Sequence, residues 1–164
     1  MRFVRELVFG DAEAFREIRL EALLLHPDAF GSVHAVEATE PISAFEQRIT
    51  KGGLFGGLKD GLLMGMAGFG AQSAAQLRHK GILGGMYVRD LERGSGLADE
   101  IVGAVLEHAR SRVELVQLSV ATTNDRAIRF YQRLGFKRYA TEPKALKVGQ
   151  RYIDEHLMVL FLDD

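Results

Sequence analysis

Apolar residues recur every three or four positions in several segments of the chain, which is the spacing of an amphipathic helix. One such segment begins after Asp11, which can serve as an N-cap, and runs through Leu25 until Pro27 ends it. Its predicted inward face consists of Phe15, Ile18, Ala22 and Leu25. The other predicted helices span residues 43–50, 96–110 and 124–134.

Local signals indicate where two of these helices begin or end. Ser43 and Glu46 have the spacing of a capping box, which predicts that the second helix opens at Ser43. Gly135 follows the last turn of the helix predicted at 124–134, and glycine is the residue that commonly terminates a helix.

Short apolar runs between turn residues predict seven strands, at 1–9, 54–58, 62–69, 81–88, 113–121, 136–148 and 151–162. The dipeptides Asp60-Gly61 and Gly149-Gln150 predict turns that join two pairs of these strands into hairpins. Residues 113–121 carry apolar side chains on both alternating faces, so this strand should lie in the interior of the sheet. The polar segment 72–80 predicts a loop.

The resulting order, β-α-α-β-β-β-α-β-α-β-β, predicts an α/β (α+β) fold. Its mixed central sheet should have six or seven strands, with helices on both faces. A length of 164 residues predicts a single domain that spans residues 1–164 and has room for a sizeable core.

Composition argues against several classes of function. A formal net charge of −1 offers no basic surface, so nucleic acid is not expected as a partner. No apolar run approaches membrane-spanning length, and the N-terminus lacks the apolar core of a signal peptide, so no membrane is expected either. The absence of cysteine excludes disulfides and thiol nucleophiles and fits a cytoplasmic protein. The five histidines show no ligand spacing, so we expect no metal.

The predicted strand at 81–88 leads into a glycine-rich turn at the start of a helix, with the sequence Arg93-Gly94-Ser95-Gly96-Leu97-Ala98. Gly94 and Gly96 let the backbone turn and approach a ligand, and the helix presents its positive end there. Taken alone, such a turn is more often an ordinary strand-to-helix connection. It lacks a Walker motif, and Asp99 stands where a dinucleotide fingerprint has its third glycine. The turn nevertheless has the chemistry of a pyrophosphate site.

The helix predicted at 124–134 carries a phenol at the edge of its apolar face. Ala127, Phe130 and Leu134 share that face, and Tyr131 lies beside it. A helical tyrosine is usually a packing residue, and Asn124 is a good N-cap for this helix. Neither residue alone predicts catalysis.

Together the two segments resemble the GNAT superfamily of N-acetyltransferases. The run from Val88 through Arg93-Gly94-Ser95-Gly96-Leu97-Ala98 is similar to the acetyl-CoA loop of that family. The residues similar to its following motif are Asn124, Ala127, Phe130-Tyr131 and Gly135-Phe136. The order of elements also matches, so the resemblance covers most of the chain.

The resemblance implies a cofactor site for acetyl-CoA. The strands at 81–88 and 113–121 should splay apart and grip the pantetheine arm, which Met86, Tyr87 and Val88 would contact. The backbone of Met86 and Val88 would pair with the arm, and an N–H there would polarise the thioester carbonyl. The cofactor residues of the loop itself would be Arg93, Gly94, Ser95, Gly96, Leu97 and Ala98, whose N–H groups would hold the pyrophosphate.

The resemblance also implies two roles on the helix at 124–134. Asn124 would contact the pantetheine or order the start of the helix. Tyr131 would be the catalytic acid that protonates the leaving CoA thiolate, an effect worth about tenfold to a thousandfold in rate at most.

Acidic residues crowd the expected pyrophosphate site. Glu92, Asp99 and Glu100 should weaken pyrophosphate binding if they face it. Asp90 occupies a position where the family often has proline, and Ser95 replaces a residue that is commonly basic.

An amine acceptor must lose a proton to a base of pKa near 7 or to a water chain. Glu37 is the candidate base, because its segment resembles the acceptor-site wall of the family, and Glu40 and His34 are the alternatives. Asp154 and Glu155 could select a cationic acceptor. Each of these residues could equally be a solvated surface residue.

The sequence therefore predicts an acetyl-CoA-dependent N-acetyltransferase that acts on a primary amine of a small molecule or peptide. A protein N-terminal acetyltransferase and a non-catalytic CoA-binding or sensing domain are the alternatives, although retention of Tyr131 disfavours the second. Length and composition leave a homodimer open.

Overall fold

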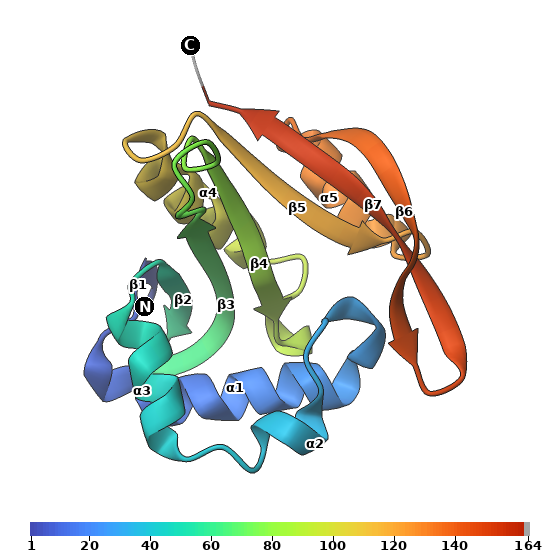
Figure 1. Ribbon diagram of the computed structural model, residues 1–164. Coiled ribbons are helices and arrows are strands. Elements are labelled where there is room, and N and C mark those ends of the chain that lie inside the picture. The colour runs from blue at the N-terminus through green and yellow to red at the C-terminus, as the bar shows by residue number, and fades with distance from the viewer. Residues whose placement is uncertain (163–164) are drawn as a thin grey trace.

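Seven strands form one mixed sheet in the order β1-β2-β3-β4-β5-β7-β6 in the computed structural model, which describes residues 1–162 (Figure 1). The strands are β1 (Arg2–Glu6), β2 (Leu54–Lys59), β3 (Leu62–Ala71), β4 (Lys80–Val88), β5 (Leu115–Ala121), β6 (Lys137–Val148) and β7 (Arg151–Phe161). Only β4 and β5 run parallel, and all other neighbouring strands are antiparallel. The predicted interior strand, β5, lies between β4 and β7.

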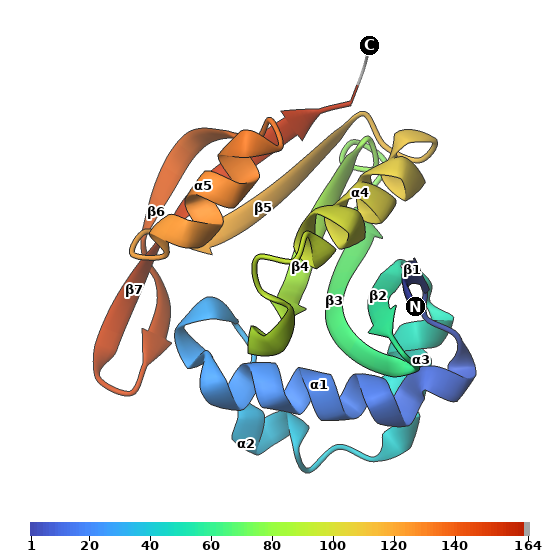
Figure 2. The same ribbon diagram turned by 180° about the vertical axis from the view of Figure 1, so that it is seen from behind.

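Helices cover both faces of the sheet, as predicted. The helices are α1 (Ala12–Leu25), α2 (His34–Glu37), α3 (Ile42–Thr50), α4 (Leu97–Arg110) and α5 (Asp125–Arg133). Helix α3 lies in front of the sheet in Figure 1, whereas α4 and α5 lie in front in the reverse view of Figure 2.

Two apolar clusters hold these layers together. The first packs α4 against the strands through Leu97, Ile101 and Val105, whose side chains are fully buried. The second lies under α1 and α3 and is centred on Ile18 and Phe45. Each of these large side chains contributes about 1.5–3 kcal/mol by leaving water. The two clusters therefore fix the helices on opposite faces of the sheet.

Both predicted hairpin turns are confirmed. Asp60 and Gly61 have φ values of 51° and 82°, and they join β2 to β3 with Lys59 opposite Leu62. Gly149 has a φ of 62° in the turn between β6 and β7. Positive φ at these positions is the conformation that Asp-Gly and glycine turns supply at low cost.

The predicted caps of the first two helices are wrong in detail. The side chain of Asp11 does not cap α1, because it accepts hydrogen bonds from the Val8 N–H and from Arg5. Helix α3 begins at Ile42 after Pro41 without a side-chain cap, so Ser43 and Glu46 form no capping box.

Two further differences concern the start of the chain. Leu25 is the last residue of α1 and remains 57% exposed, because the helix ends before its side chain can reach the core, and Leu23 is buried instead. The helix α2 was not predicted, since its four residues are too few to show a periodicity.

Strands β4 and β5 separate along most of their length. They pair only where Lys80, Gly81 and Ile82 face Leu115, Val116 and Gln117. Beyond this point the strands diverge (Figure 1), so the edge of β4 that faces β5 has no ladder partner. The predicted splayed pair is thus present, and it opens a space in the middle of the sheet.

Candidate active site

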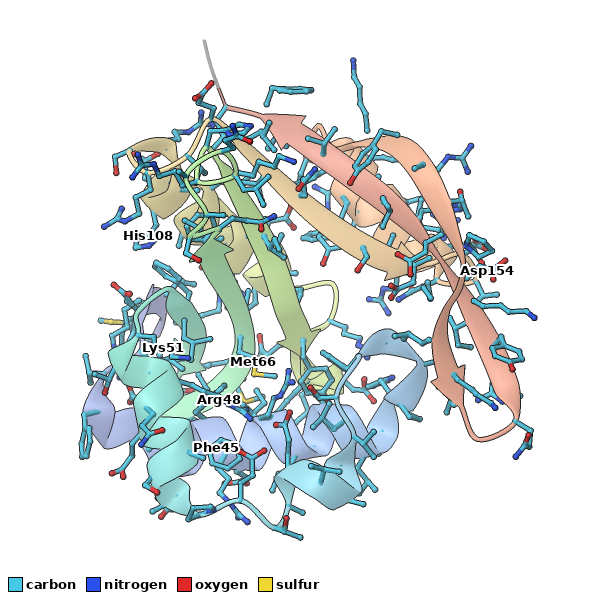
Figure 3. All side chains as sticks on the ribbon, in the orientation of Figure 1. Phe45, Arg48, Lys51, Met66, His108 and Asp154 are labelled. Atoms are coloured by element: carbon cyan, nitrogen blue, oxygen red, sulfur yellow. The ribbon has the colours of Figure 1, made fainter. Side chains whose placement is uncertain are left out.

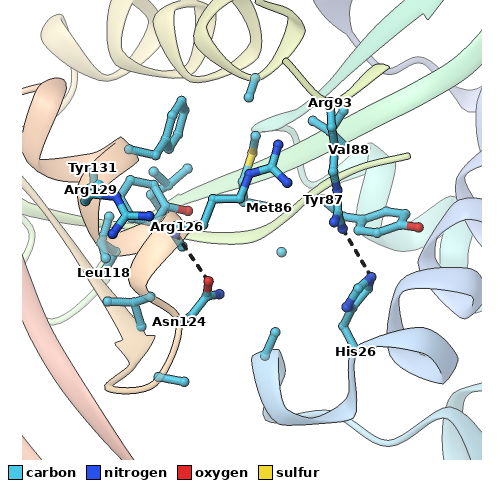
Figure 4. Close-up of a pocket in the computed structure, with 18 of the residues that line it drawn as sticks. His26, Met86, Tyr87, Val88, Arg93, Leu118, Asn124, Arg126, Arg129 and Tyr131 are labelled. Carbon is cyan, nitrogen blue, oxygen red and sulfur yellow. Dashed lines mark hydrogen bonds between the residues drawn. The ribbon is translucent and has the colours of Figure 1, made fainter. Parts of the chain in front are cut away.

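A cavity of about 770 Å³ occupies the space between the splayed strands. Its walls come from β4, the glycine loop before α4, β5 and α5. Residues 83–88 form one wall and residues 118–121 form the opposite wall. The two segments singled out from the sequence therefore line one and the same cavity (Figure 4).

Three N–H groups of the glycine loop are free to bind a ligand. The N–H groups of Gly94, Gly96 and Ala98 have no acceptor among the described residues, and all three residues line the cavity. Gly94 and Gly96 have φ values of 78° and 92°, a conformation that turns the chain into α4 and favours glycine. With the positive end of α4 behind them, these groups form an anion site.

The residues between them hold the loop in shape. The Ser95 N–H donates to the Glu92 carbonyl at 3.2 Å, and the Ser95 hydroxyl donates to the same carbonyl at 2.6 Å. The Leu97 N–H donates to the Ser95 Oγ, while the Leu97 side chain is fully buried in the core. Neither Ser95 nor Leu97 lines the cavity, so only Arg93, Gly94, Gly96 and Ala98 of the predicted run line it.

The acidic residues around this loop are each paired with a cation. Glu92 is buried, and the Lys59 ammonium contacts it at 2.8 Å and helps to hold its pKa below the usual range. Asp99 pairs with Arg133 at 2.7 Å, and Glu100 pairs with Arg2. The repulsion expected from three free carboxylates is therefore largely compensated within the fold.

Successive side chains of β4 point to opposite faces of the sheet. Met86 and Val88 line the cavity and pack with the α4 cluster. The ring of Tyr87 points to the opposite face, where its hydroxyl donates to Glu21 at 2.7 Å. Burial, followed by that hydrogen bond, raises the pKa of Tyr87. Tyr87 can thus contact a ligand in this cavity only through its backbone.

Tyr131 presents its hydroxyl to the cavity from α5 (Figure 4). Its ring is buried and packs edge-on against Phe130 and Phe136, with ring centroids at 5.2 and 5.7 Å. Burial raises the pKa of Tyr131 to about 12. The phenol is therefore protonated at neutral pH and can act as a proton donor.

Asn124 has the structural role that the sequence allowed for it. Its side-chain Oδ1 accepts a hydrogen bond from the Ala127 N–H at 3.2 Å and caps α5. The residue also lines the cavity, so its amide N–H₂ is available to a ligand.

Two arginines at the cavity rim were missed from the sequence. Arg126 and Arg129 line the cavity on the same helix as Tyr131 (Figure 4), and Arg133 of that helix lines the cavity as well. Their spacing of three and four residues, which places all three on one face of a helix, was the signal available. These guanidinium groups add positive charge where an anionic ligand enters.

Arg93 reaches across the mouth of the cavity. Its Nη2 lies 3.3 Å from the Nε2 of His26, and its Nε pairs with Asp90 at 3.1 Å (Figure 4). His26 terminates α1, and its ring lies 5.6 Å from that of Tyr87. Arg93, one of the predicted cofactor residues, therefore lines the cavity, and its guanidinium contacts the end of the first helix.

A second cavity, of about 1170 Å³, lies on the α1 and α3 side of β4 and shares Gly84 and Gly85 with the first. Glu37, the predicted base, belongs to this second cavity. Its buried carboxylate accepts hydrogen bonds from Arg19 Nε and Nη2, both at 3.1 Å, and from Arg48 Nη1 at 3.0 Å.

A base at Glu37 would need a pKa raised toward 7, whereas the pKa of this carboxyl is lowered. Burial alone pushes the pKa upwards, but the hydrogen bonds and charges of Arg19 and Arg48 outweigh it and lower the pKa to about 2. A carboxylate held this firmly in its charged form is a poor proton acceptor at neutral pH. Glu37 instead positions the two arginines.

The two alternative candidates for the base and the two residues that could select a cationic acceptor line neither cavity. Glu40 pairs with Arg48 at 3.3 Å, and His34 begins the short helix α2. Asp154 accepts a hydrogen bond from the Lys144 N–H and so fixes the last hairpin. Burial raises the pKa of the Glu155 carboxyl on β7, but this residue lines neither cavity.

Two other features bear on the kind of site. Within residues 1–162, no three histidine, aspartate or glutamate side chains come together as a metal site. None of the helices in the described part of the chain has the length and apolar content needed to span a bilayer.

Comparison with known proteins gives one consistent result. The model of the Acetyltransferase (GNAT) family matches residues 14–136. An L-methionine sulfoximine/L-methionine sulfone acetyltransferase of Pseudomonas aeruginosa is 26% identical over 150 residues, which are 86% of this chain and 87% of that protein. The L-amino acid N-acyltransferase MnaT of Escherichia coli is 28% identical over 167 residues, with coverage of 100% and 94%.

A solved structure has the same fold over the same length. The structure of yncA from Salmonella typhimurium, determined with acetyl-CoA, superposes with a TM-score of 0.87 at 22% identity. The match covers 100% of this chain and 95% of that chain.

Proposed function

The chain belongs to the acetyltransferase (GNAT) family, and from this premise we propose how its cavity binds acetyl-CoA and transfers the acetyl group. The protein is an acetyl-CoA-dependent N-acetyltransferase. Both relatives described above are named for small acceptors of the amino-acid type. We propose a primary amine of a small molecule as the acceptor of this protein.

The pyrophosphate of acetyl-CoA binds at the free N–H groups of Gly94, Gly96 and Ala98. This assignment is supported by their convergence on one cavity at the positive end of α4. Arg126 and Arg129 stand at the rim and add charge-assisted contacts to phosphate. The pantetheine arm runs along the unpaired edge of β4, where the backbone of Met86 and Val88 supplies the hydrogen bonds that β5 does not make.

Acetyl transfer takes place where the arm passes Tyr131. The neutral amine attacks the thioester carbonyl, the C–N bond forms, and the C–S bond breaks. The Tyr131 phenol donates its proton to the departing sulfur, the amine loses its proton to water, and water returns a proton to the Tyr131 oxygen. The observation that carries this proposal is that the buried phenol, the open edge of β4 and the anion site line a single cavity.

A steady-state assay of thiol release tests the proposal. Purified protein is mixed with acetyl-CoA and a panel of primary amines, and free CoA thiol is followed with time. We expect thiol release that depends on an amine, with the acetylated amine as the second product. Tight CoA binding without thiol release for any amine would contradict catalysis by this cavity.

A further inference from the structure

The second cavity contains a cationic group that the proposed reaction does not use. Arg19 projects from α1 with its side chain 15% exposed, and it binds Glu37 through Nε and Nη2 only. Its third nitrogen, Nη1, has no hydrogen-bond acceptor among the described residues. A β-carbon built on Gly85 would lie 3.5 Å from this nitrogen, so the free donor faces β4.

Arg19 stands at the wall between the two cavities. Gly84 and Gly85 line both of them, and the guanidinium of Arg19 packs over the ring of Phe30, which lines the first cavity. The contact with Phe30, at 5.5 Å from the ring centroid, and the double hydrogen bond to Glu37 hold the guanidinium in one orientation. A rigid donor is thus placed where an acceptor must meet the thioester.

The rest of the second cavity is also cationic. Arg48, Lys51 and Arg112 line it with Arg19, against the carboxylates of Glu6 and Glu37. Glu6 accepts a hydrogen bond from the Gly53 N–H, and Glu40 pairs with Arg48 from outside the cavity wall. Figure 3 shows Arg48 and Lys51 around β3 on the face that carries α3. The cavity therefore favours a ligand with an anionic group over a ligand with a cationic group.

We infer that Arg19 anchors an anionic group of the acceptor, and that the acceptor is an amine with a carboxylate close to its amino group. This inference rests on the proposed acetyl transfer. In an α-amino acid, one carbon separates the carboxylate from the amine, so a carboxylate on Arg19 Nη1 places the amine close to Gly84 and Gly85, which line both cavities. Polyamines and other acceptors with several positive charges are disfavoured by the same charges.

Matched acceptors test this inference in the wild-type protein. Each set consists of an L-amino acid, its carboxamide and its decarboxylated amine, for example L-methionine, L-methioninamide and 3-(methylthio)propylamine. We expect kcat/KM for the amino acid to exceed that for the other two by at least about tenfold, because only the amino acid pairs with Arg19. Equal or higher kcat/KM for the two analogues that lack the carboxylate, across several sets, would overturn the inference.

Substitution of Arg19 assigns the preference to this residue. Arg19→Gln should raise KM for the amino acid by about ten- to a hundredfold and leave KM for the carboxamide and for acetyl-CoA unchanged. Arg16→Gln is the matched control, because Arg16 lies on the same helix and donates to the Ala38 carbonyl outside the cavity wall. An equal loss of kcat/KM for amino acid and carboxamide would mean that Arg19 is only structural.

Failure of the inference and failure of the proposed activity give different results. If acetyl-CoA binds but no amine is acetylated, the proposed activity is wrong. Calorimetry with N-acetyl-L-methionine and CoA-loaded protein then tests whether Arg19 binds a carboxylate. Binding that is lost in Arg19→Gln but kept in Arg16→Gln would support the site, and no binding to the wild type would overturn it.

Discussion

Arg133, the last residue of α5, contacts Asp99 in the first turn of α4 at 2.7 Å. This pair connects two helices that line the cavity proposed for the cofactor. Both residues line this cavity, so the guanidinium compensates a carboxylate that would otherwise face the phosphates in the proposed binding mode.

Loss of this compensation should weaken cofactor binding. Arg133→Gln should raise the Kd for CoA by about two- to fivefold at low salt, because the charge of Asp99 is then unpaired near the phosphates. The effect should shrink as salt increases. Calorimetry with the Arg133→Gln, Asp99→Asn double variant is the control, and we expect it to recover most of the affinity. A double variant as weak as Arg133→Gln would mean that Arg133 binds phosphate directly.

An acidic side chain in the glycine loop should block the proposed pyrophosphate site. Gly96→Glu should abolish CoA binding, because it places bulk and negative charge at a free N–H group. Gly61→Glu is the matched control, since Gly61 has a similar positive φ of 82° and lies in the turn between β2 and β3. Both variants place a side chain at a positive φ, but only Gly96 lines the cavity, so only Gly96→Glu should lose binding. Unchanged CoA affinity in Gly96→Glu would disprove the site.

Tyr131→Phe should separate chemistry from binding. We expect kcat to fall by about tenfold to a thousandfold, with the Kd for CoA unchanged, because the ring still packs between Phe130 and Phe136. With its pKa raised to about 12, the wild-type phenol stays protonated between pH 7 and 10. The wild-type rate should therefore show no alkaline decline from Tyr131 in that range. A variant that turns over like the wild type would assign the proton to water.

Glu37→Gln should lower the free energy of unfolding. Removal of the Glu37 charge from this buried ion cluster leaves Arg19 without an acidic partner and Arg48 with Glu40 alone, and it should cost about 3 kcal/mol. The acidic limb of the rate profile should keep its midpoint, because a group with a pKa of about 2 does not titrate near pH 6. A lowered carboxyl pKa stabilises the folded state above the unfolded pKa, so the wild type should lose this stability as the pH falls from about 4.5 toward 2. Thermal unfolding as a function of pH measures the difference between the two proteins.

The sequence predicted those parts of the fold that depend on local signals. The turn residues Asp60 and Gly61, the periodicity of α4 and the cap at Asn124 each act over a few positions, and each is confirmed. The glycine loop and Tyr131 were likewise visible, because each lies in a short motif. Their convergence on one cavity came from the family resemblance and not from periodicity.

What the sequence did not predict depends on contacts between distant positions. Glu37 is 18 residues from Arg19, and Glu92 is 33 residues from Lys59, so neither partner could be read from spacing. A base at Glu37 would need a raised pKa, which burial alone would give. The two guanidinium groups that reverse this effect of burial could not be assigned to Glu37 from the sequence.

The unpaired edge of β4 has a consequence for the measured stability of the whole fold. Backbone groups that β5 leaves unsatisfied must find partners in water or in a ligand. A cofactor that lies along this edge acts as a missing strand and binds only the folded chain. By mass action, the melting temperature then rises with cofactor concentration. At a cofactor concentration one hundred times Kd, the free energy of unfolding increases by about 2.7 kcal/mol. Stability values for this protein thus describe a protein–ligand pair, and they have a definite meaning only at a stated acetyl-CoA concentration.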